Sequence, residues 1–241
     1  MAVVVITGAL VASAATAAGA AAAEPAFFEC AKVTSGDFAS KSCSEGGLHG
    51  AGKFELREGI GRKHRFTAKT REIELSSEAF EMHCEKTTMS GEDTSPTTVA
   101  TVFMTMNRCE EVGTLAPCTS SGEKQGVVVL GPMSGSLGYV SRENKEVGVD
   151  LAGEGGAPLS EFGCNRSGLA EYQLKGSIIG LRKGGIDAIA KSFSLTFGVP
   201  RFEGGELDVP VLLDLGTGEE EEATFGGAKL KASGEKLEIK A

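Results

Sequence analysis

The chain of 241 residues contains no tryptophan and only two tyrosines, Tyr139 and Tyr172. Proteins use aromatic rings to stack on sugars and to enclose quaternary ammonium groups. The sequence therefore offers little material for an aromatic sugar platform or for an aromatic cage around a cation.

Charged side chains are absent from residues 1–23, and the first charged residue is Glu24. This stretch is apolar, rich in alanine, and ends in the small residues that a signal peptidase cuts. We therefore expect a signal peptide over residues 1–23, a mature chain that starts at Glu24, and a secreted, extracellular protein. The run lacks a basic residue before its apolar part, and it approaches the ~20 residues that span a bilayer, so an uncleaved membrane anchor is the alternative. No later segment is apolar enough to span, and no cysteine stands where a lipid would be attached.

Basic residues are outnumbered, at 24 against 33 acidic ones, and the net charge is −9. Nucleic-acid binding requires a basic stripe, so we expect no nucleic-acid partner. A short basic patch at residues 62–65 could contact an anionic wall polymer, although a solvated hairpin face is the default interpretation.

The cysteines form no C-x-x-C pair and the three histidines are scattered, so we expect no metal site and no cofactor. An even number of cysteines in an exported chain indicates disulfides, and six cysteines allow 15 pairings. Two pairs bracket short loops, and the remaining two cysteines each end an alternating apolar pattern. The pairing hypothesis is Cys30 with Cys43, Cys109 with Cys118, and Cys84 with Cys164.

Apolar residues alternate with polar ones in several short segments, which is typical of strands with one face on a core and one face in water. Such strands belong to antiparallel sheets. Glycine is about twice as frequent as usual, and its pairs recur at the spacing of hairpin turns. We therefore expect an all-β fold, either an antiparallel β-sandwich or a closed or partly closed β-barrel with disulfides.

The expected strands are 52–57, 71–76, 80–85, 146–151, 192–197 and 236–240, with Ile73, Leu75, Phe80, Met82, Val147, Val149, Leu151, Phe193, Leu195, Phe197, Leu237 and Ile239 buried and His83 turned outward. Residues 97–106 and 169–179 are longer and could run along or between two sheets. Expected turns include Ser90-Gly91, Ser134-Gly135, Gly155-Gly156 and Gly184-Gly185. The only helix candidate after residue 23 is the short segment 186–191.

Three parts of the chain are expected. Residues 1–23 form the signal peptide, residues 24–63 form an N-terminal appendage pinned by its own disulfide, and residues 64–241 form an antiparallel β domain. About 40 residues bury too little surface for a separate domain, so the appendage should pack on the β domain.

A series of short strings resembles a family of secreted, cysteine-bridged, all-β bacterial proteins that is abundant as paralogues in some soil bacteria. The strings include Met82-His-Cys84, Met106-Asn-Arg-Cys109, Ala116-Pro-Cys118, Glu161-Phe-Gly-Cys164 and Phe202-Glu-Gly-Gly205, and the resemblance covers roughly residues 71–241. It implies an exported all-β domain with this cysteine framework. It implies no activity, ligand or site residue, because the family has no established function.

Candidate catalytic groups are few. No G-x-S-x-G elbow exists, and Ser136 lies in an expected hairpin, where a turn role is the better interpretation, although exposed His83 could partner a serine. Glycoside hydrolysis requires two carboxylates in a cleft. Glu203 with Glu206 and Asp208 with Asp214 are the pairs to inspect, against the default that they are solvated.

Two charged or glycine-rich segments remain. Glu219, Glu220, Glu221 and Glu222 could attract calcium, but a strand sends alternate side chains to opposite faces, so an edge-protecting charge run is the better interpretation. Residues 180–185 match neither a Walker loop nor a dinucleotide fingerprint.

Three function classes follow. The first is a non-catalytic extracellular or cell-envelope module, binding or structural, with a cell-wall polymer or another extracellular partner. The second is a barrel that carries a small apolar ligand, and the third is a carboxylate-based glycan hydrolase. The sequence favours the first, and it leaves the oligomeric state open.

Overall fold

A computed structural model describes residues 24–43, 50–59, 64–165, 171–184, 186–187, 189–199, 201–203, 210–216, 218–226 and 229–240. The expected signal peptide, residues 1–23, lies outside these ranges. The all-β prediction is confirmed. In the described part of the chain strands dominate, every pair of named strands is antiparallel, and the helical structure is the short 3-10 turn η1 (Glu154–Gly156).

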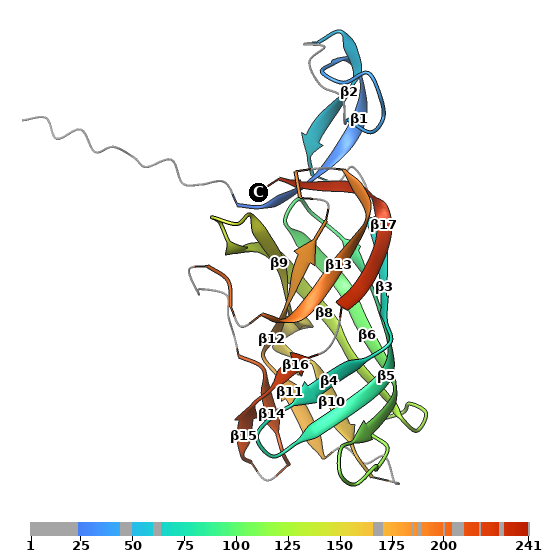
Figure 1. Cartoon of the computed structure of the whole chain (residues 1–241), viewed down its shortest axis with the longest axis vertical. Coiled ribbons are helices and arrows are strands. Elements are labelled where there is room, and N and C mark those ends of the chain that lie inside the picture. The colour runs from blue at the N-terminus through green and yellow to red at the C-terminus, as the bar shows by residue number, and fades with distance from the viewer. Residues whose placement is uncertain are drawn as a thin grey trace, which may run out of the picture.

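Eight strands close into an antiparallel barrel, so the barrel alternative is correct (Figure 1). Each barrel strand pairs with the next one along the chain, and the last pairs with the first, at Lys231–Lys69 and Ser233–Thr67. The barrel strands are β3 (His64–Thr70), β5 (Glu81–Asp93), β6 (Thr98–Glu111), β8 (Val127–Ser141), β9 (Glu146–Gly153), β12 (Ser177–Lys183), β13 (Ala190–Val199) and β17 (Lys229–Lys240). Closure removes the free edges that an open sheet would expose.

A second sheet lies at one end of the barrel, the lower end in Figure 1. Its strands follow the order β15 (Glu220–Glu222), β14 (Leu212–Asp214), β11 (Tyr172–Lys175), β10 (Ser160–Gly163) and β7 (Thr119–Ser120). The short strands β4 (Ile73–Ser76) and β16 (Thr224–Gly226) continue the barrel wall beyond β5. Gly176, at φ +90°, separates β11 from β12. The described part of the segment 169–179 therefore does pass between two sheets.

The N-terminal hairpin of β1 (Ala26–Gly36) and β2 (Gly52–Glu58) projects from the opposite end of the barrel (Figure 1). Residues Ala26 to Phe28 of β1 pair with β17, and the strand then leaves the barrel and pairs with β2. The expected strand at 52–57 is therefore present. The division into an appendage of residues 24–63 and a domain of residues 64–241 stays a prediction.

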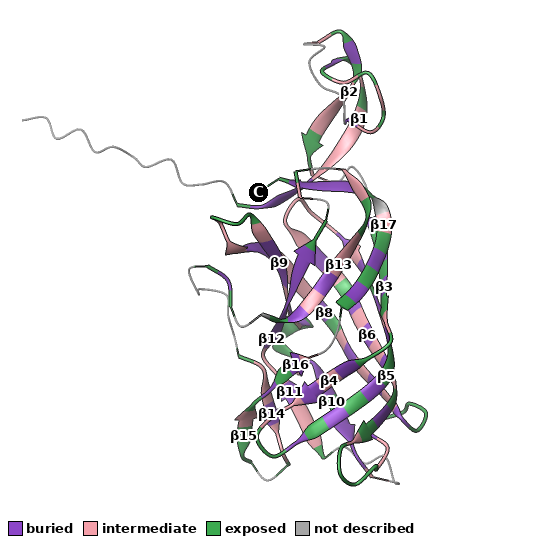
Figure 2. Cartoon of the chain, in the orientation of Figure 1, coloured by how far each residue is buried: buried purple, intermediate pink, exposed green. Residues whose placement is uncertain are grey.

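Burial follows the alternation that the sequence indicates, and Figure 2 shows buried and exposed residues in turn along the barrel strands. The expected inward side chains are buried, except Phe193, which is half-buried against the core. His83 is exposed, as expected. Methionine, leucine and valine fill the barrel, and the fully buried examples include Met89, Met104, Met106, Val128, Leu130 and Met133. Unbranched methionine adapts to irregular gaps, which suits a strongly curved wall.

The disulfide hypothesis is right for one pair and wrong for two. Cys30 is bonded to Cys43 in the hairpin. Cys84, however, is bonded to Cys109 and not to Cys164, because β5 and β6 place the two residues directly opposite each other, with Cα atoms 4.1 Å apart.

Cys118 is likewise bonded to Cys164, not to Cys109, because β7 and β10 are neighbours in the second sheet. Two of the bonds therefore join neighbouring strands, and the third joins β1 to the connection that follows it. None ties distant strands together in the way the hypothesis assumed.

Two expected turns are wrong, and the short helix candidate is not helical in its described residues. Ser90-Gly91 lies inside β5, and Ser134-Gly135, with Ser136, lies inside β8. A Cβ at Gly135 would lie 1.8 Å from the carbonyl oxygen of Asp150, so this glycine permits close strand approach and not a turn. The segment 186–191 begins with an isolated bridge from Ile186 to Ile239 and enters β13 at Ala190.

Candidate functional site

A shallow depression of about 280 Å³ lies on the outer face of the second sheet. Gln173 of β11 is directly opposite Glu161 of β10 on one side and Asp214 of β14 on the other. Directly opposite residues of antiparallel strands share a face, so the three side chains form a row. The lining residues are Glu161, Glu171, Tyr172, Gln173, Asp214 and Gly216.

Hydrogen bonds fix the row. The Gln173 side-chain amide donates to Glu161 Oε1 at 2.6 Å, and the Gly216 amide donates to Asp214 Oδ1 at 2.9 Å. Lys175 Nζ lies 3.4 Å from Asp214 Oδ2 and 2.7 Å from Glu220 Oε1. The bond from Gly216 and the ammonium group of Lys175 lower the pKa of Asp214, although burial works against them. Asp214 is therefore held as a carboxylate.

Aromatic packing supports the depression from beneath. Tyr172 lies 4.6 Å from Phe80 and 5.4 Å from Phe162, between ring centroids, and Phe162 is fully buried. Burial, followed by the charge of Glu111, raises the pKa of Tyr172, which therefore keeps its phenolic proton. The depression presents carboxylates and an amide above a rigid apolar layer.

A buried polar cluster lies at the other end of the barrel, next to the root of the hairpin. His64 of β3 is directly opposite Asp93 of β5, and both are over nine-tenths buried, at 6% and 7% exposed. His64 Nε2 is 3.6 Å from Glu29 Oε2 of β1. Neither ring nitrogen of His64 has a hydrogen-bond partner among the described residues.

Arg182 of β12 completes this barrel-end cluster and is 4% exposed. Its guanidinium lies 4.1 Å from the ring centroid of Phe193 and 5.6 Å from that of Phe27, and its Nε donates to the Gly184 carbonyl at 3.4 Å. Burial raises the pKa of Asp93 to about 6, and the charge of Arg182 offsets part of that rise. Burial lowers the pKa of Arg182 to about 10, so the guanidinium remains charged at neutral pH.

Each carboxylate pair selected from the sequence has one member outside the described residues, so both pairs stay predictions. Asp214 lines the depression, but Asp208 and Glu206 lie outside the described residues. Glu203 accepts a hydrogen bond from the backbone amide of Arg142, beside Phe202, which is packed on the outer barrel wall over Gly138. Glu203 thus fastens a connecting segment to the barrel.

Ser136 and His83 are far apart. Along β6, Ser136 is opposite Thr98 and His83 is opposite Glu110. Twelve residues of strand span roughly 40 Å, so these two side chains cannot form a catalytic pair. Ser136 is a strand residue, which corrects the turn interpretation.

The acidic run and the described part of the basic patch both make contacts within the fold. Glu220, Glu221 and Glu222 form the edge strand of the second sheet, which fits an edge-protecting run, and Glu221 accepts hydrogen bonds from Ser77 Oγ and the Ala79 amide. In the basic patch, Arg65 is exposed and paired with Glu92, whereas His64 is buried, so the patch is not a uniform solvated face. Arg62 and Lys63 lie outside the described residues.

Residues 180–183 belong to β12, and Gly184 follows at φ +88°. No helix follows them in the described part of the chain that could present its N-terminus to a phosphate. They form part of the barrel wall.

Sequence reasoning missed Glu161, Gln173, Asp93 and Arg182. The period-2 pattern Ile178, Gly180, Arg182 on β12 does signal an inward arginine, which would require a buried partner. The row formed by Glu161 and Gln173 gives no such signal, because it depends on the register of three strands.

Comparison with known proteins finds no matching family model, no matching curated protein and no matching solved structure. Within the described ranges, no helix is long and apolar enough to cross a membrane, and no cluster of three or more His, Cys, Asp or Glu residues is arranged to hold a metal ion.

Proposed function

We propose that this protein is an exported, non-catalytic binding module of the cell envelope or extracellular medium, with its ligand surface in the depression on the second sheet. Three disulfides suit an oxidising compartment, in agreement with the leader-like composition of residues 1–23. The observation that carries the proposal is the row of Glu161, Gln173 and Asp214 along the depression.

The ligand class is a polymer with cationic, hydroxyl-rich units, such as an amino-sugar chain of a cell wall. Carboxylates and an amide in one row can accept hydrogen bonds from ammonium and hydroxyl groups. Glu161, Glu171 and Asp214 give the depression negative charge, and the protein as a whole carries −9. A cationic ligand therefore gains electrostatic attraction over a neutral one.

Binding is favoured over glycan hydrolysis and over transport of an apolar ligand. A hydrolase needs a carboxyl group that holds a proton near neutral pH, whereas the pKa of Asp214 is lowered. An apolar carrier needs an open interior, whereas Met89, Met104 and Leu130 fill the described barrel interior.

The test titrates the disulfide-bonded protein with a glucosamine oligomer and with the N-acetylated oligomer of equal length, by calorimetry. We expect the glucosamine oligomer to bind at least about tenfold more tightly, and the double variant Glu161→Gln/Asp214→Asn to lose about tenfold of that affinity. Glu143→Gln, an exposed change in the turn after β8, is the matched control. Equal affinity for both oligomers, or an unchanged affinity in the double variant, would refute the proposal.

A further inference from the structure

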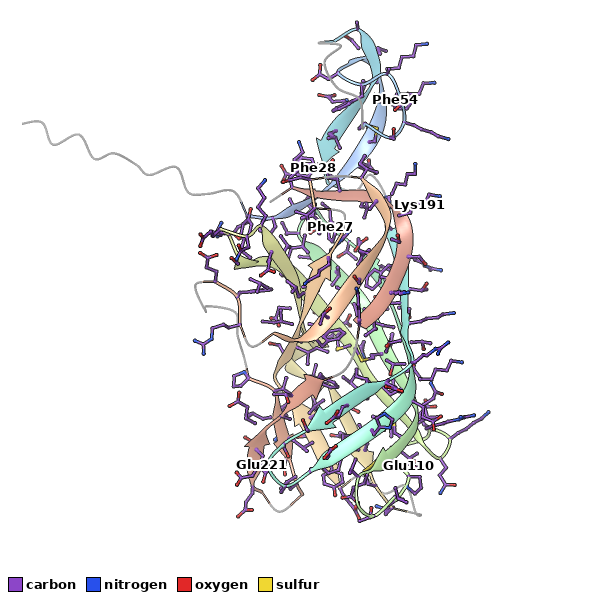
Figure 3. All side chains as sticks on the ribbon, in the orientation of Figure 1. Phe27, Phe28, Phe54, Glu110, Lys191 and Glu221 are labelled. Carbon is purple, nitrogen blue, oxygen red and sulfur yellow. A yellow bond between two sulfur atoms is a disulfide. The ribbon has the colours of Figure 1, made fainter. Side chains whose placement is uncertain are left out.

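Buried polar residues lie at the barrel end beside the root of the hairpin. β1 meets the barrel through Ala26, Phe27 and Phe28, and Phe27 is 1% exposed. The Phe27 amide donates to the Pro96 carbonyl at 2.6 Å, and the Gly59 amide donates to the Phe27 carbonyl at 2.8 Å. Figure 3 shows Phe27 and Phe28 at this junction and Phe54 farther out on the hairpin. These few contacts decide how firmly the hairpin is held.

His64 faces this junction from inside the barrel. Its Nε2 lies 3.6 Å from Glu29 Oε2, which is the contact of an ion pair only when the imidazole is protonated. A neutral imidazole at this distance leaves both ring nitrogens without a hydrogen bond among the described residues. A buried polar group without a hydrogen-bond partner is destabilising, whereas a protonated His64 can pair with Glu29. The two protonation states of His64 therefore hold Glu29, and with it β1, to different degrees.

The charged groups around His64 come from several strands packed at this end, and Arg57 of β2 lies directly opposite Glu29. Glu29 approaches from β1, Asp93 lies opposite on β5, and Arg182 reaches Asp93 from β12. On β17, Glu238 lies opposite Phe28, and the ammonium group of Lys240 lies 5.0 Å from the ring centroid of Phe28. Arg65, next to His64, points outward to Glu92.

We propose that His64 and Glu29 form a proton-operated latch that holds β1, and with it the projecting hairpin, against the barrel end. With a proton on His64, the imidazolium and the Glu29 carboxylate pair and the latch is closed. Without that proton the pair is lost, and the hairpin root opens more often. The hairpin projects from the barrel end (Figure 1), so the latch controls how the hairpin surface is presented to the surroundings.

The test measures hydrogen exchange of the Phe27 and Gly59 amides by NMR between pH 5 and pH 8, relative to barrel amides such as Met104 and corrected for intrinsic exchange. We expect relative protection of the junction to fall about fivefold from pH 5 to pH 8. In His64→Gln and in Glu29→Gln, the relative protection should no longer change with pH. His83→Gln, which alters an exposed histidine on β5, should behave like the unaltered protein.

A further variant, Asp93→Asn, separates the His64–Glu29 latch from an effect of the Asp93 carboxyl group. Asp93→Asn removes the buried carboxyl group directly opposite His64 and should leave the pH dependence in place, because Glu29 still meets His64. A flat response in the unaltered protein would overturn the latch, as would a pH dependence that survives Glu29→Gln or disappears only in Asp93→Asn. If His64→Gln fails to fold, Glu29→Gln alone decides, since it leaves the barrel interior unchanged.

Discussion

At the scale of single residues, the two-residue period of a strand and the space beside each position decide which side chain fits there. Alternating Ile73, Leu75 and Met82 were correctly predicted to be buried, because a one-sided strand repeats every two residues. Gly91 and Gly135 were wrongly predicted as turns, because a glycine in sequence does not reveal whether it supplies a positive φ or a missing side chain. At Gly91 a Cβ would lie 2.7 Å from the Phe66 ring, and at Gly135 it would meet backbone.

The glycine at 135 should tolerate no side chain. In Gly135→Ala the new methyl group meets the Asp150 carbonyl oxygen, which belongs to the neighbouring strand and cannot rotate away. We expect the free energy of unfolding to fall by about 1–3 kcal/mol, measured as a lower urea midpoint. Gly226→Ala is the control, since the nearest atom to its Cβ, Glu74 Cβ, is 4.0 Å away and its φ is not positive. Equal midpoints for the two variants would contradict the packing argument.

Asp93 should make the stability of the protein depend on pH. Its pKa rises from 3.8 to about 6 on folding, so the folded state binds the proton more tightly than the unfolded chain. Its stabilising contribution is therefore complete below the unfolded pKa and is lost as the pH rises through about 6.

In Asp93→Asn this pH dependence should disappear. The free energy of unfolding should fall by about 2 kcal/mol more in the unaltered protein than in Asp93→Asn between pH 4.5 and pH 7.5, measured by urea unfolding. Asp37→Asn, at an exposed position, should follow the unaltered protein. The same pH slope in Asp93→Asn and in the unaltered protein would contradict the burial of this carboxyl.

At the scale of elements, the strands could be predicted from the sequence and their neighbours could not. The alternation of apolar and polar residues identifies β9 and the last part of β17 as strands. It does not show which strand each of them pairs with. The disulfide pairing was mispredicted because the neighbours of each strand were unknown. Sequence distance favoured Cys109 with Cys118, whereas strand register places Cys84 opposite Cys109. The row in the depression was missed for the same reason.

The revised pairing is open to a direct chemical measurement. Digestion without reduction, followed by mass spectrometry, should release peptides that join Cys84 to Cys109 and Cys118 to Cys164, together with a Cys30–Cys43 peptide. The same digest after reduction should contain none of these linked peptides, which serves as the control. A peptide joining Cys84 to Cys164 would restore the earlier hypothesis and would contradict the register of β5 and β6.

For the whole molecule, the sequence indicated an all-β body and left barrel and sandwich unresolved. The choice depends on one long-range pairing, between β3 near the start of the chain and β17 at its end. Every other barrel contact joins strands that follow one another in the barrel order, and an open sheet would have given the same local patterns. The closure of the barrel therefore cannot be predicted from the local pattern of short segments.

The place of β17 has a consequence for how the protein comes into being. This strand, Lys229–Lys240, pairs with β13, with β3 and with β1, so three strands depend on it for their backbone hydrogen bonds. Without β17 the barrel wall would be open between β13 and β3. The barrel can therefore close only once this strand is in place, so loss of β17 would open the wall and release the root of β1 together.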